Sequence, residues 1–185
     1  MLTEFQAKKL KHMFSLFDND KDGYLTEEDY VRIGDNFARL YDYPLGSPAH
    51  MTLQKEFAVF WQGIERLASG STPGKVSSDA FLAGQDLWLS DREGFNASTE
   101  ALVKMTLEIA DRDGDGKLAQ QEFLFNLLAS NVNLSDAVES FQHIDQDGDG
   151  YVTKEEWREA WSSSITVMIH MRPATGCLAR SGDRI

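Results

Sequence analysis

A twelve-residue acidic pattern occurs three times in this chain and constrains its fold more than any other feature of the sequence. In each copy aspartate stands at positions one, three and five, glycine at position six, an aliphatic residue at position eight and an acid at position twelve. An aromatic residue follows each copy directly. Repetition in one register favours three copies of a single structural unit over the alternative of three acidic, solvated turns. The copies are DNDKDGYLTEED (18–29), DRDGDGKLAQQE (111–122) and DQDGDGYVTKEE (145–156).

The spacing of the acids suits a cage for a hard cation. Calcium takes six to eight oxygen ligands at about 2.3–2.6 Å in a pliable shell. Side chains at positions one, three, five and twelve and the backbone carbonyl at position seven supply such oxygens, while glycine permits the sharp bend at position six. The candidate ligands are Asp18, Asp20, Asp22, Tyr24 and Asp29 in the first copy, Asp111, Asp113, Asp115, Lys117 and Glu122 in the second, and Asp145, Asp147, Asp149, Tyr151 and Glu156 in the third.

The pattern resembles the calcium loop of the EF-hand family, D-x-[DN]-x-[DN]-G-x5-E, which the copies at 111–122 and 145–156 match in full. Apolar residues stand eight, four and one positions before each copy, which is the spacing of one helix face. The resemblance implies an all-α fold of helix–loop–helix hands that join in pairs through short antiparallel β bridges between their loops.

Three hands leave one without a mate, and the stretch SGSTPGKVSSDA (69–80) supplies a fourth. Gly74 falls at position six and Val76 at position eight, although Glu65 stands where the other incoming helices carry Phe or Leu. We expect this hand to bind no calcium, because its ligand positions lack carboxylates. The alternative is an irregular linker between helices. The residues at positions one, three, five and twelve are Ser69, Ser71, Pro73 and Ala80.

The four hands are predicted to form two pairs in a compact molecule. The first pair occupies 1–92 and the second 93–170, followed by a tail at 171–185 that contains the single cysteine, Cys177. The polar stretch SDREGFNAS (90–98) is the predicted joint between the pairs. Two apolar contacts are expected across the paired loops, Leu25 with Val76 and Leu118 with Val152.

The first loop differs from the others at position twelve, where Asp29 replaces glutamate. Glutamate reaches an ion with both oxygens, whereas the shorter aspartate tends to offer one. A smaller coordination number suits Mg²⁺, which takes about six ligands at 2.0–2.1 Å. We therefore expect three calcium sites, of which the first also accepts magnesium. The alternative is that a backbone adjustment restores bidentate geometry.

Composition and motifs exclude several classes of protein. A formal charge of −12 argues against nucleic-acid binding, which needs a basic face. No apolar run approaches the roughly 18 residues that a membrane span needs. The charged N-terminal stretch does not resemble a secretory signal. No catalytic motif is recognisable. These observations predict a cytoplasmic, monomeric protein that is not an enzyme.

Calcium-binding patterns in hands one, three and four make the chain similar to the sarcoplasmic calcium-binding protein group, including calerythrins and the coelenterazine-binding and photoprotein branch. This resemblance implies an intracellular calcium buffer or signal modulator with a closed aromatic core. One alternative is a sensor that opens an apolar groove to a protein target that the sequence does not name; such grooves are typically rich in methionine. A second alternative is a calcium-regulated carrier of a small, luciferin-type molecule.

Overall fold

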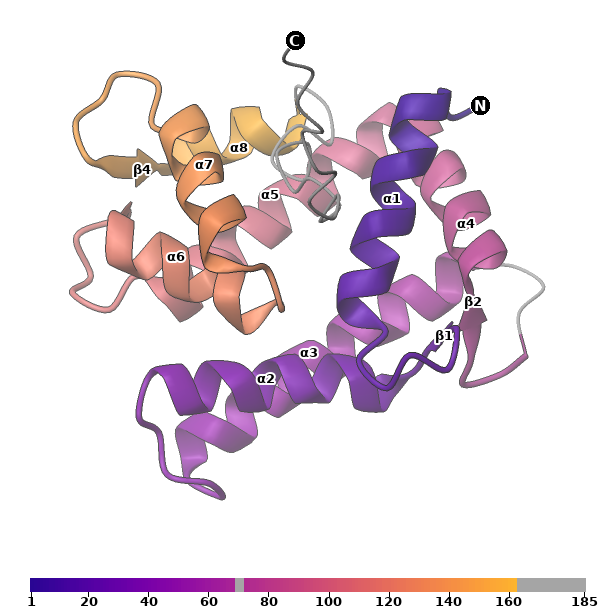
Figure 1. Cartoon of the computed structure of the whole chain (residues 1–185), viewed down its shortest axis with the longest axis horizontal. Coiled ribbons are helices and arrows are strands. Elements are labelled where there is room, and N and C mark those ends of the chain that lie inside the picture. The colour runs from indigo at the N-terminus through magenta and orange to yellow at the C-terminus, as the bar shows by residue number, and fades with distance from the viewer. Residues whose placement is uncertain (69–71, 163–185) are drawn as a thin grey trace, which may run out of the picture.

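The structure, a computed structural model, describes residues 1–68 and 72–162 (Figure 1). These ranges hold eight α-helices and four short β-strands, which confirms the predicted all-α fold with small β bridges. No helix in them is both long and apolar enough to cross a bilayer. The elements are α1 (Glu4–Phe17), β1 (Tyr24–Leu25), α2 (Glu27–Leu40), α3 (Pro48–Leu67), β2 (Val76–Ser77), α4 (Ser78–Ser90), α5 (Arg92–Ala110), β3 (Lys117–Ala119), α6 (Gln120–Ala129), α7 (Leu134–Ile144), β4 (Tyr151–Thr153) and α8 (Lys154–Ser162).

Several helices begin at side chains that accept hydrogen bonds from the first free backbone N–H groups. The Thr3 hydroxyl accepts from the N–H of Gln6, and the Gln6 side chain accepts from the N–H of Thr3, which forms a capping box at α1. Ser47 caps α3, with Pro48 as its first residue. Local sequence therefore determines where these helices start.

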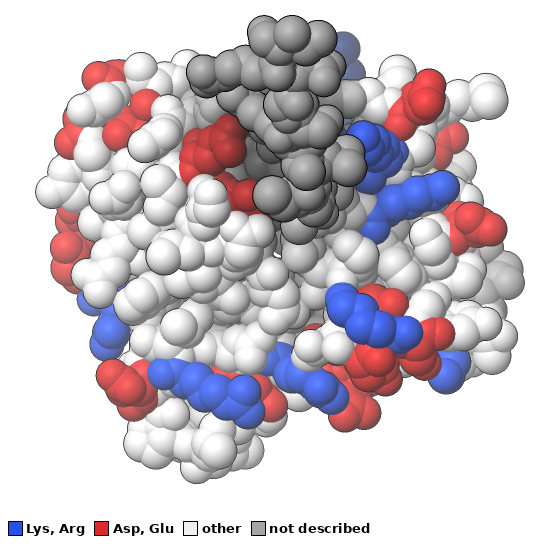
Figure 2. Space-filling model, in the orientation of Figure 1, with Lys and Arg blue, Asp and Glu red and all other residues white. Residues whose placement is uncertain are grey.

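The paired strands join the hands two by two. Strands β1 and β2 pair antiparallel, as do β3 and β4, so hand one pairs with hand two and hand three with hand four. The loops of the two pairs lie at opposite ends of the molecule (Figure 1). Acidic side chains lie at both ends and also along the lower edge of this face, where Lys and Arg side chains lie among them (Figure 2). The register confirms both predicted apolar contacts, which join four fully buried residues: Leu25 with Val76 and Leu118 with Val152.

Each pair of hands encloses its own aromatic core. In the first pair the rings of Tyr30 and Trp61 lie 5.7 Å apart. In the second pair Phe123 and Trp157 meet edge to face at 5.2 Å. Such pairs stabilise a core beyond the burial of their area. The aromatic residue that follows each acidic loop is thus an anchor of the core.

The two pairs contact one another along α2 and α6. The Tyr41 ring packs edge to face on Phe125 at 5.9 Å. The Asn131 amide donates to the carbonyl of Leu16 at 2.9 Å, which joins the turn after α6 to α1. Apolar packing and hydrogen bonds between distant segments therefore hold the halves together.

The joint between the pairs is shorter than the sequence predicts. Helix α4 ends at Ser90 and α5 already begins at Arg92, so most of the polar stretch 90–98 is helical. The cause is local, since the Asp91 carboxylate accepts from the N–H of Gly94 and starts α5 at once. The boundaries 1–92 and 93–170 stay a prediction, and the tail at 171–185 lies outside the described residues.

Candidate metal centres

The three acidic loops share one internal hydrogen-bond pattern, which begins at the glycine of position six. Its φ is 86° to 88° in all three loops, a left-handed value that costs a residue with Cβ more than glycine. Its N–H donates to one oxygen of the position-one aspartate and ties the bend to the first ligand. The bonds join Gly23 to Asp18 (3.1 Å), Gly116 to Asp111 (2.9 Å) and Gly150 to Asp145 (3.1 Å).

The aspartates at positions three and five each accept a hydrogen bond from the backbone N–H two residues later. In every one of these bonds Oδ1 is the acceptor, so the local turn orients each carboxylate. Oδ2 accepts none of these turn bonds. For position three the acceptors are Asp20, Asp113 and Asp147, each at 3.1 Å. For position five they are Asp22 (2.8 Å), Asp115 (2.9 Å) and Asp149 (2.8 Å).

The acid at position twelve closes each loop by accepting from the N–H groups of positions two and nine. Glu122 and Glu156 do this with separate oxygens, and Asp29 does the same although its side chain is one methylene shorter. The bonds from position two come from Asn19 (3.1 Å), Arg112 (2.7 Å) and Gln146 (2.9 Å). Those from position nine come from Thr26, Ala119 and Thr153, each at 2.9 Å.

Three carboxylates converge in each of the three loops, but the third member of the group differs between loops. The loops at 111–122 and 145–156 belong to hands three and four and are called loops three and four. In them the carboxylate oxygens that lie within 4.8 Å of one another come from the acid of position twelve and the aspartates of positions one and three. In loop one the group consists of Asp18, Asp20 and Asp22, without Asp29. The sequence difference at Asp29 therefore has a structural counterpart, because position five takes the place of position twelve in the convergent group of loop one, whereas Asp115 and Asp149 lie outside the other two groups.

Two of the position-one carboxylates have an oxygen that suits a cation. Oδ1 of Asp18 and Oδ1 of Asp145 are buried, and neither has a hydrogen-bond partner in the described part of the chain. A buried carboxylate oxygen without a partner is costly unless a positive charge compensates it. In loop three Oδ1 of Asp111 instead accepts from the N–H of Gly114 at 2.7 Å. The donor sets of the loops thus fit a hard divalent ion.

All fifteen predicted ligand residues lie in the three loops, and those of position seven begin the short strands. Tyr24 is the first residue of β1, Lys117 of β3 and Tyr151 of β4. The strand pairing that joins two hands therefore starts at the residues whose carbonyls are the predicted backbone ligands.

The second loop closes without carboxylate ligands of its own. Gly74 has a φ of 80°, as at position six of the other loops, and Val76 enters β2, which confirms the predicted register. The N–H of Gly74 donates to the Glu65 carboxylate at 2.6 Å. Glu65, which breaks the apolar pattern of the incoming helix, thus replaces the aspartate that holds this bend elsewhere. Pro73 and Ala80 have no ligand group, and Ser69 and Ser71 lie outside the described residues.

Ionisation near the loops follows from burial and hydrogen bonds. Burial by itself would raise the pKa of the Glu156 carboxyl, but hydrogen bonds from Thr153 and from loop amides outweigh it and hold that pKa below its usual value. Burial raises the pKa of the Tyr30 hydroxyl far above its usual range, and the neighbouring Asp29 carboxylate adds to this. The acid that closes loop four therefore stays ionised at neutral pH, as an ion ligand must.

Two contacts at the loops were not predicted from the sequence. The Lys75 ammonium, from the second loop, lies 3.3 Å from Oδ2 of Asp22 in the first. The Arg112 guanidinium, from loop three, lies over the Tyr41 ring, 5.1 Å from its centroid. Neither contact follows from the spacing within one loop, because both join side chains of different hands.

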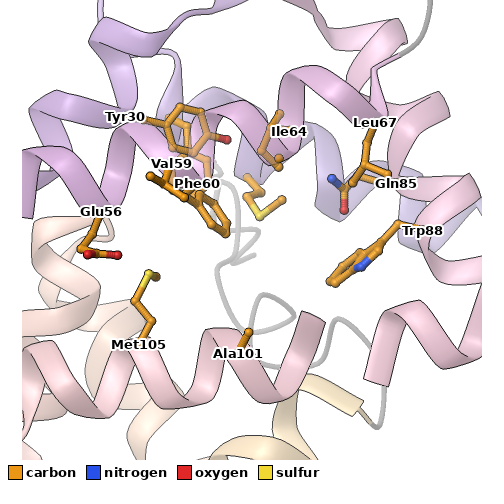
Figure 3. A pocket seen from close by; sticks show the side chains of 13 residues that line it. Tyr30, Glu56, Val59, Phe60, Ile64, Leu67, Gln85, Trp88, Ala101 and Met105 are labelled. Atoms are coloured by element: carbon orange, nitrogen blue, oxygen red, sulfur yellow. The ribbon is translucent and has the colours of Figure 1, made fainter. Parts of the chain in front are cut away.

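An apolar cavity of about 340 Å³ lies between the first pair of hands and α5 (Figure 3). Helix α3 lines it with Val59, Phe60 and Ile64, while Ala101 and Met105 of α5 face them. The few polar groups at its wall are the side chains of Glu56 and Gln85, the indole nitrogen of Trp88 and the Tyr30 hydroxyl. The Tyr30 hydroxyl has no hydrogen-bond partner in the described ranges. The sequence did not predict this cavity.

Two known protein families match this chain, in agreement with its three repeated loops on paired helix–loop–helix units. The EF-hand domain pair family matches residues 7–128, and the EF hand domain family matches residues 136–164. The chain belongs to the EF-hand family. It is an EF-hand calcium-binding protein whose three acidic loops are the candidate calcium sites.

Similar proteins confirm the predicted resemblance to the calerythrin and sarcoplasmic group. Calerythrin of Saccharopolyspora erythraea is 23% identical over 158 residues, covering 84% of this chain and 89% of calerythrin. A Streptomyces coelicolor calcium-binding protein, described in the context of prokaryotic calcium-mediated regulation, has a similar structure, with a TM-score of 0.67, 22% identity and coverage of 89% and 99%. The amphioxus sarcoplasmic calcium-binding protein has a TM-score of 0.65, 20% identity and coverage of 94% and 100%. The two solved structures share the fold over 89% and 94% of this chain.

Proposed function

We propose that this EF-hand protein binds a divalent cation in each of the loops 18–29, 111–122 and 145–156 and acts as a calcium buffer or calcium-signal modulator. The observation that carries the proposal is the set of hydrogen bonds that the three loops share, together with the group of three carboxylates that converges in each. The unpartnered oxygens of Asp18 and Asp145 support it. In this proposal each ion contacts the five predicted ligand residues of its loop, with position seven acting through its carbonyl.

A closed core supports the buffer role over the sensor role. The aromatic residues that follow the three loops are almost fully buried, with Tyr30 and Phe123 at 0% and Trp157 at 2% exposure. Sensors instead expose a groove when calcium binds. These buried rings anchor the helices that follow the loops. Ion binding is therefore expected to change the exposed apolar surface little.

Loop one is proposed to accept magnesium as well as calcium. Its convergent group consists of three aspartates, whereas the other two groups contain a glutamate. A shell with fewer protein oxygens suits an ion that keeps water molecules, as Mg²⁺ does. At resting calcium levels the first site is therefore proposed to hold magnesium.

The first test is a calorimetric calcium titration of the full chain in millimolar magnesium, repeated with an apolar fluorescent dye. The proposal expects three sites and no calcium-dependent rise in dye fluorescence. Asp18→Asn, Asp111→Asn and Asp145→Asn should each remove one site. Fewer than three sites would overturn the site assignment, and a large rise in dye fluorescence with calcium would favour the sensor.

The apolar cavity favours a second candidate function, the carriage of a small organic molecule. Its volume and its wall of aromatic and methionine side chains suit an apolar ligand with one or two polar groups. Dye that binds before calcium is added, and that is lost in a Phe60→Trp variant that fills the cavity, would support this candidate. Absence of dye binding with and without calcium would exclude it for ligands of that kind.

The proposal also covers catalysis, nucleic-acid binding, localisation and oligomeric state. A binding role without catalysis agrees with EF-hand proteins in general, and a formal charge of −12 argues against nucleic-acid binding. We propose a cytoplasmic monomer whose partners are calcium ions. Sedimentation with and without calcium tests the oligomeric state.

A further inference from the structure

We propose that Lys75 of the degenerate second hand is a tethered cation that lowers the affinity of loop one for divalent ions. This inference rests on the proposed function of loop one as a metal site. In this proposal the second hand is more than a structural partner, because its Lys75 side chain contacts Asp22, a predicted ligand of loop one.

The pairing of the two loops places the ammonium at the first site. Strands β1 and β2 run antiparallel with Tyr24 opposite Ser77, which brings the end of loop two against loop one. The Lys75 Nζ atom lies 3.3 Å from Oδ2 of Asp22, the oxygen that the loop's own turn leaves available. The same ammonium lies 5.1 Å from the centroid of the Tyr24 ring. Lys75 therefore contacts both a carboxylate ligand and the side chain of position seven.

The second pair of hands provides an internal comparison. There Lys117 and Tyr151 occupy position seven of the two paired loops, and the Lys117 Nζ atom lies over the Tyr151 ring at 4.1 Å. Among the described residues, no carboxylate lies within ion-pair distance of Lys117. The lysine–tyrosine contact is thus common to both pairs, whereas the ion pair with a ligand carboxylate belongs to the first pair.

Charge and geometry make the contact antagonistic to metal binding. The ammonium pairs with an oxygen of a predicted ligand carboxylate, so it competes with an entering ion for Asp22 and repels that ion once it is bound. Both side chains are partly solvated, at 50% for Lys75 and 35% for Asp22, so the effect is that of a surface pair. Such pairs correspond to a change in affinity of about two- to fivefold.

Lys75 and Asp29 are expected to control different properties of loop one. An ammonium repels Mg²⁺ and Ca²⁺ alike, because both carry the same charge. Removing it should therefore raise both affinities by the same factor and leave their ratio unchanged. The length of the acid at position twelve instead changes the number of oxygens offered, which affects the ratio.

The experiment compares Lys75→Gln with two controls on the full chain. Lys75→Arg keeps the charge, and Lys104→Gln removes the exposed ion pair with Glu108 on α5. Calcium and magnesium titrations are followed by ¹H–¹⁵N NMR at the backbone amides of position six, where Gly23 reports loop one and Gly116 and Gly150 report the other two loops.

The inference expects Lys75→Gln to bind both ions at loop one about two- to fivefold more tightly, with the gain lost at high salt. The other two loops and both control variants should keep wild-type affinities. An unchanged loop-one affinity in Lys75→Gln, or the same gain in a control, overturns the inference while the site itself stands. If Gly23 responds to neither ion in the wild type or in Lys75→Gln, the proposed site fails and the inference fails with it.

Discussion

The guanidinium of Arg112 lies over the ring of Tyr41, 5.1 Å from its centroid, and so joins the third loop to the end of α2 in the first hand. Arg112 also donates its backbone N–H to Glu122, the acid that closes loop three. The Tyr41 ring is buried and packs on Phe125 of α6. One residue of a metal loop is therefore in contact with the core of the opposite pair.

The contact between Arg112 and Tyr41 predicts a measurable coupling energy. A cation over an aromatic face contributes about 0.5–1 kcal/mol at an exposed site. A double-mutant cycle of Arg112→Gln and Tyr41→Leu, measured by urea unfolding, should return a coupling of that size. Arg32→Gln, which removes an exposed pair with Glu28, is the matched control for loss of one guanidinium. Additive effects of the two substitutions would contradict the contact.

The hydrogen bond between Glu65 and Gly74 predicts that Glu65→Ala loosens the second loop. Removing the acceptor leaves the Gly74 N–H without its partner and is expected to cost about 1 kcal/mol. Hydrogen exchange at the Gly74 amide should become faster, while exchange at Gly116 should not change. Glu108→Ala, at an exposed acid of α5, serves as the control. Equal protection of Gly74 in the variant and the wild type would show that another group holds this bend.

The length of Asp29 predicts the ion preference of loop one. Asp29→Glu should raise the calcium affinity relative to the magnesium affinity at this loop, because the longer carboxylate joins the convergent group as Glu122 and Glu156 do. Competition titrations of the two ions, followed at Gly23, measure the ratio. The reverse change, Glu122→Asp, should lower the ratio at loop three. An unchanged ratio in both variants would show that the backbone compensates for side-chain length.

Removal of the bound ions is expected to lower the stability of the fold strongly. The ion-free loops concentrate negative charge, and each site filled at a hundred times its dissociation constant adds about 2.7 kcal/mol to the free energy of unfolding. Thermal unfolding should therefore shift to a markedly lower temperature when a chelator replaces calcium. A variant with Asp18, Asp111 and Asp145 all changed to Asn should lose this response. A chelator-independent melting temperature in the wild type would argue against three filled sites.

The lowered pKa of Glu156 predicts the pH dependence of the ion-free protein. A carboxyl whose pKa is lower in the folded state stabilises it above the ordinary value of 4.5, and that contribution is lost as the pH falls through the folded-state pKa. Thr153→Val removes the hydroxyl that donates to Oε2 of Glu156 at 2.8 Å, so the pKa of Glu156 should rise toward its ordinary value. Carbon NMR of the side-chain carboxyl measures the shift, with Thr52→Val as a control on a helix surface. The same titration of Glu156 in Thr153→Val and the wild type would contradict the assigned cause.

The sequence by itself determined the loops and their pairing. The hydrogen bonds of each acidic loop join residues at most ten positions apart, as from Arg112 to Glu122, so a short motif specifies the whole arrangement. The apolar residue at position eight then decides the register, which is why Leu25 opposite Val76 could be predicted. Even the degenerate hand was recognisable, because its glycine and valine keep the positions that the backbone requires.

Tertiary structure alone decided which side chains of different hands meet. The ion pair of Lys75 with Asp22 joins residues 53 positions apart and arises only after β1 and β2 have paired. Arg112 meets Tyr41 only because α2 packs beside α6. The exclusion of Asp29 from the convergent group and the cavity beneath α3 depend on distances of a few ångströms between packed elements. Such distances depend on how side chains of separate elements fill a shared space, and spacing along the chain does not encode them.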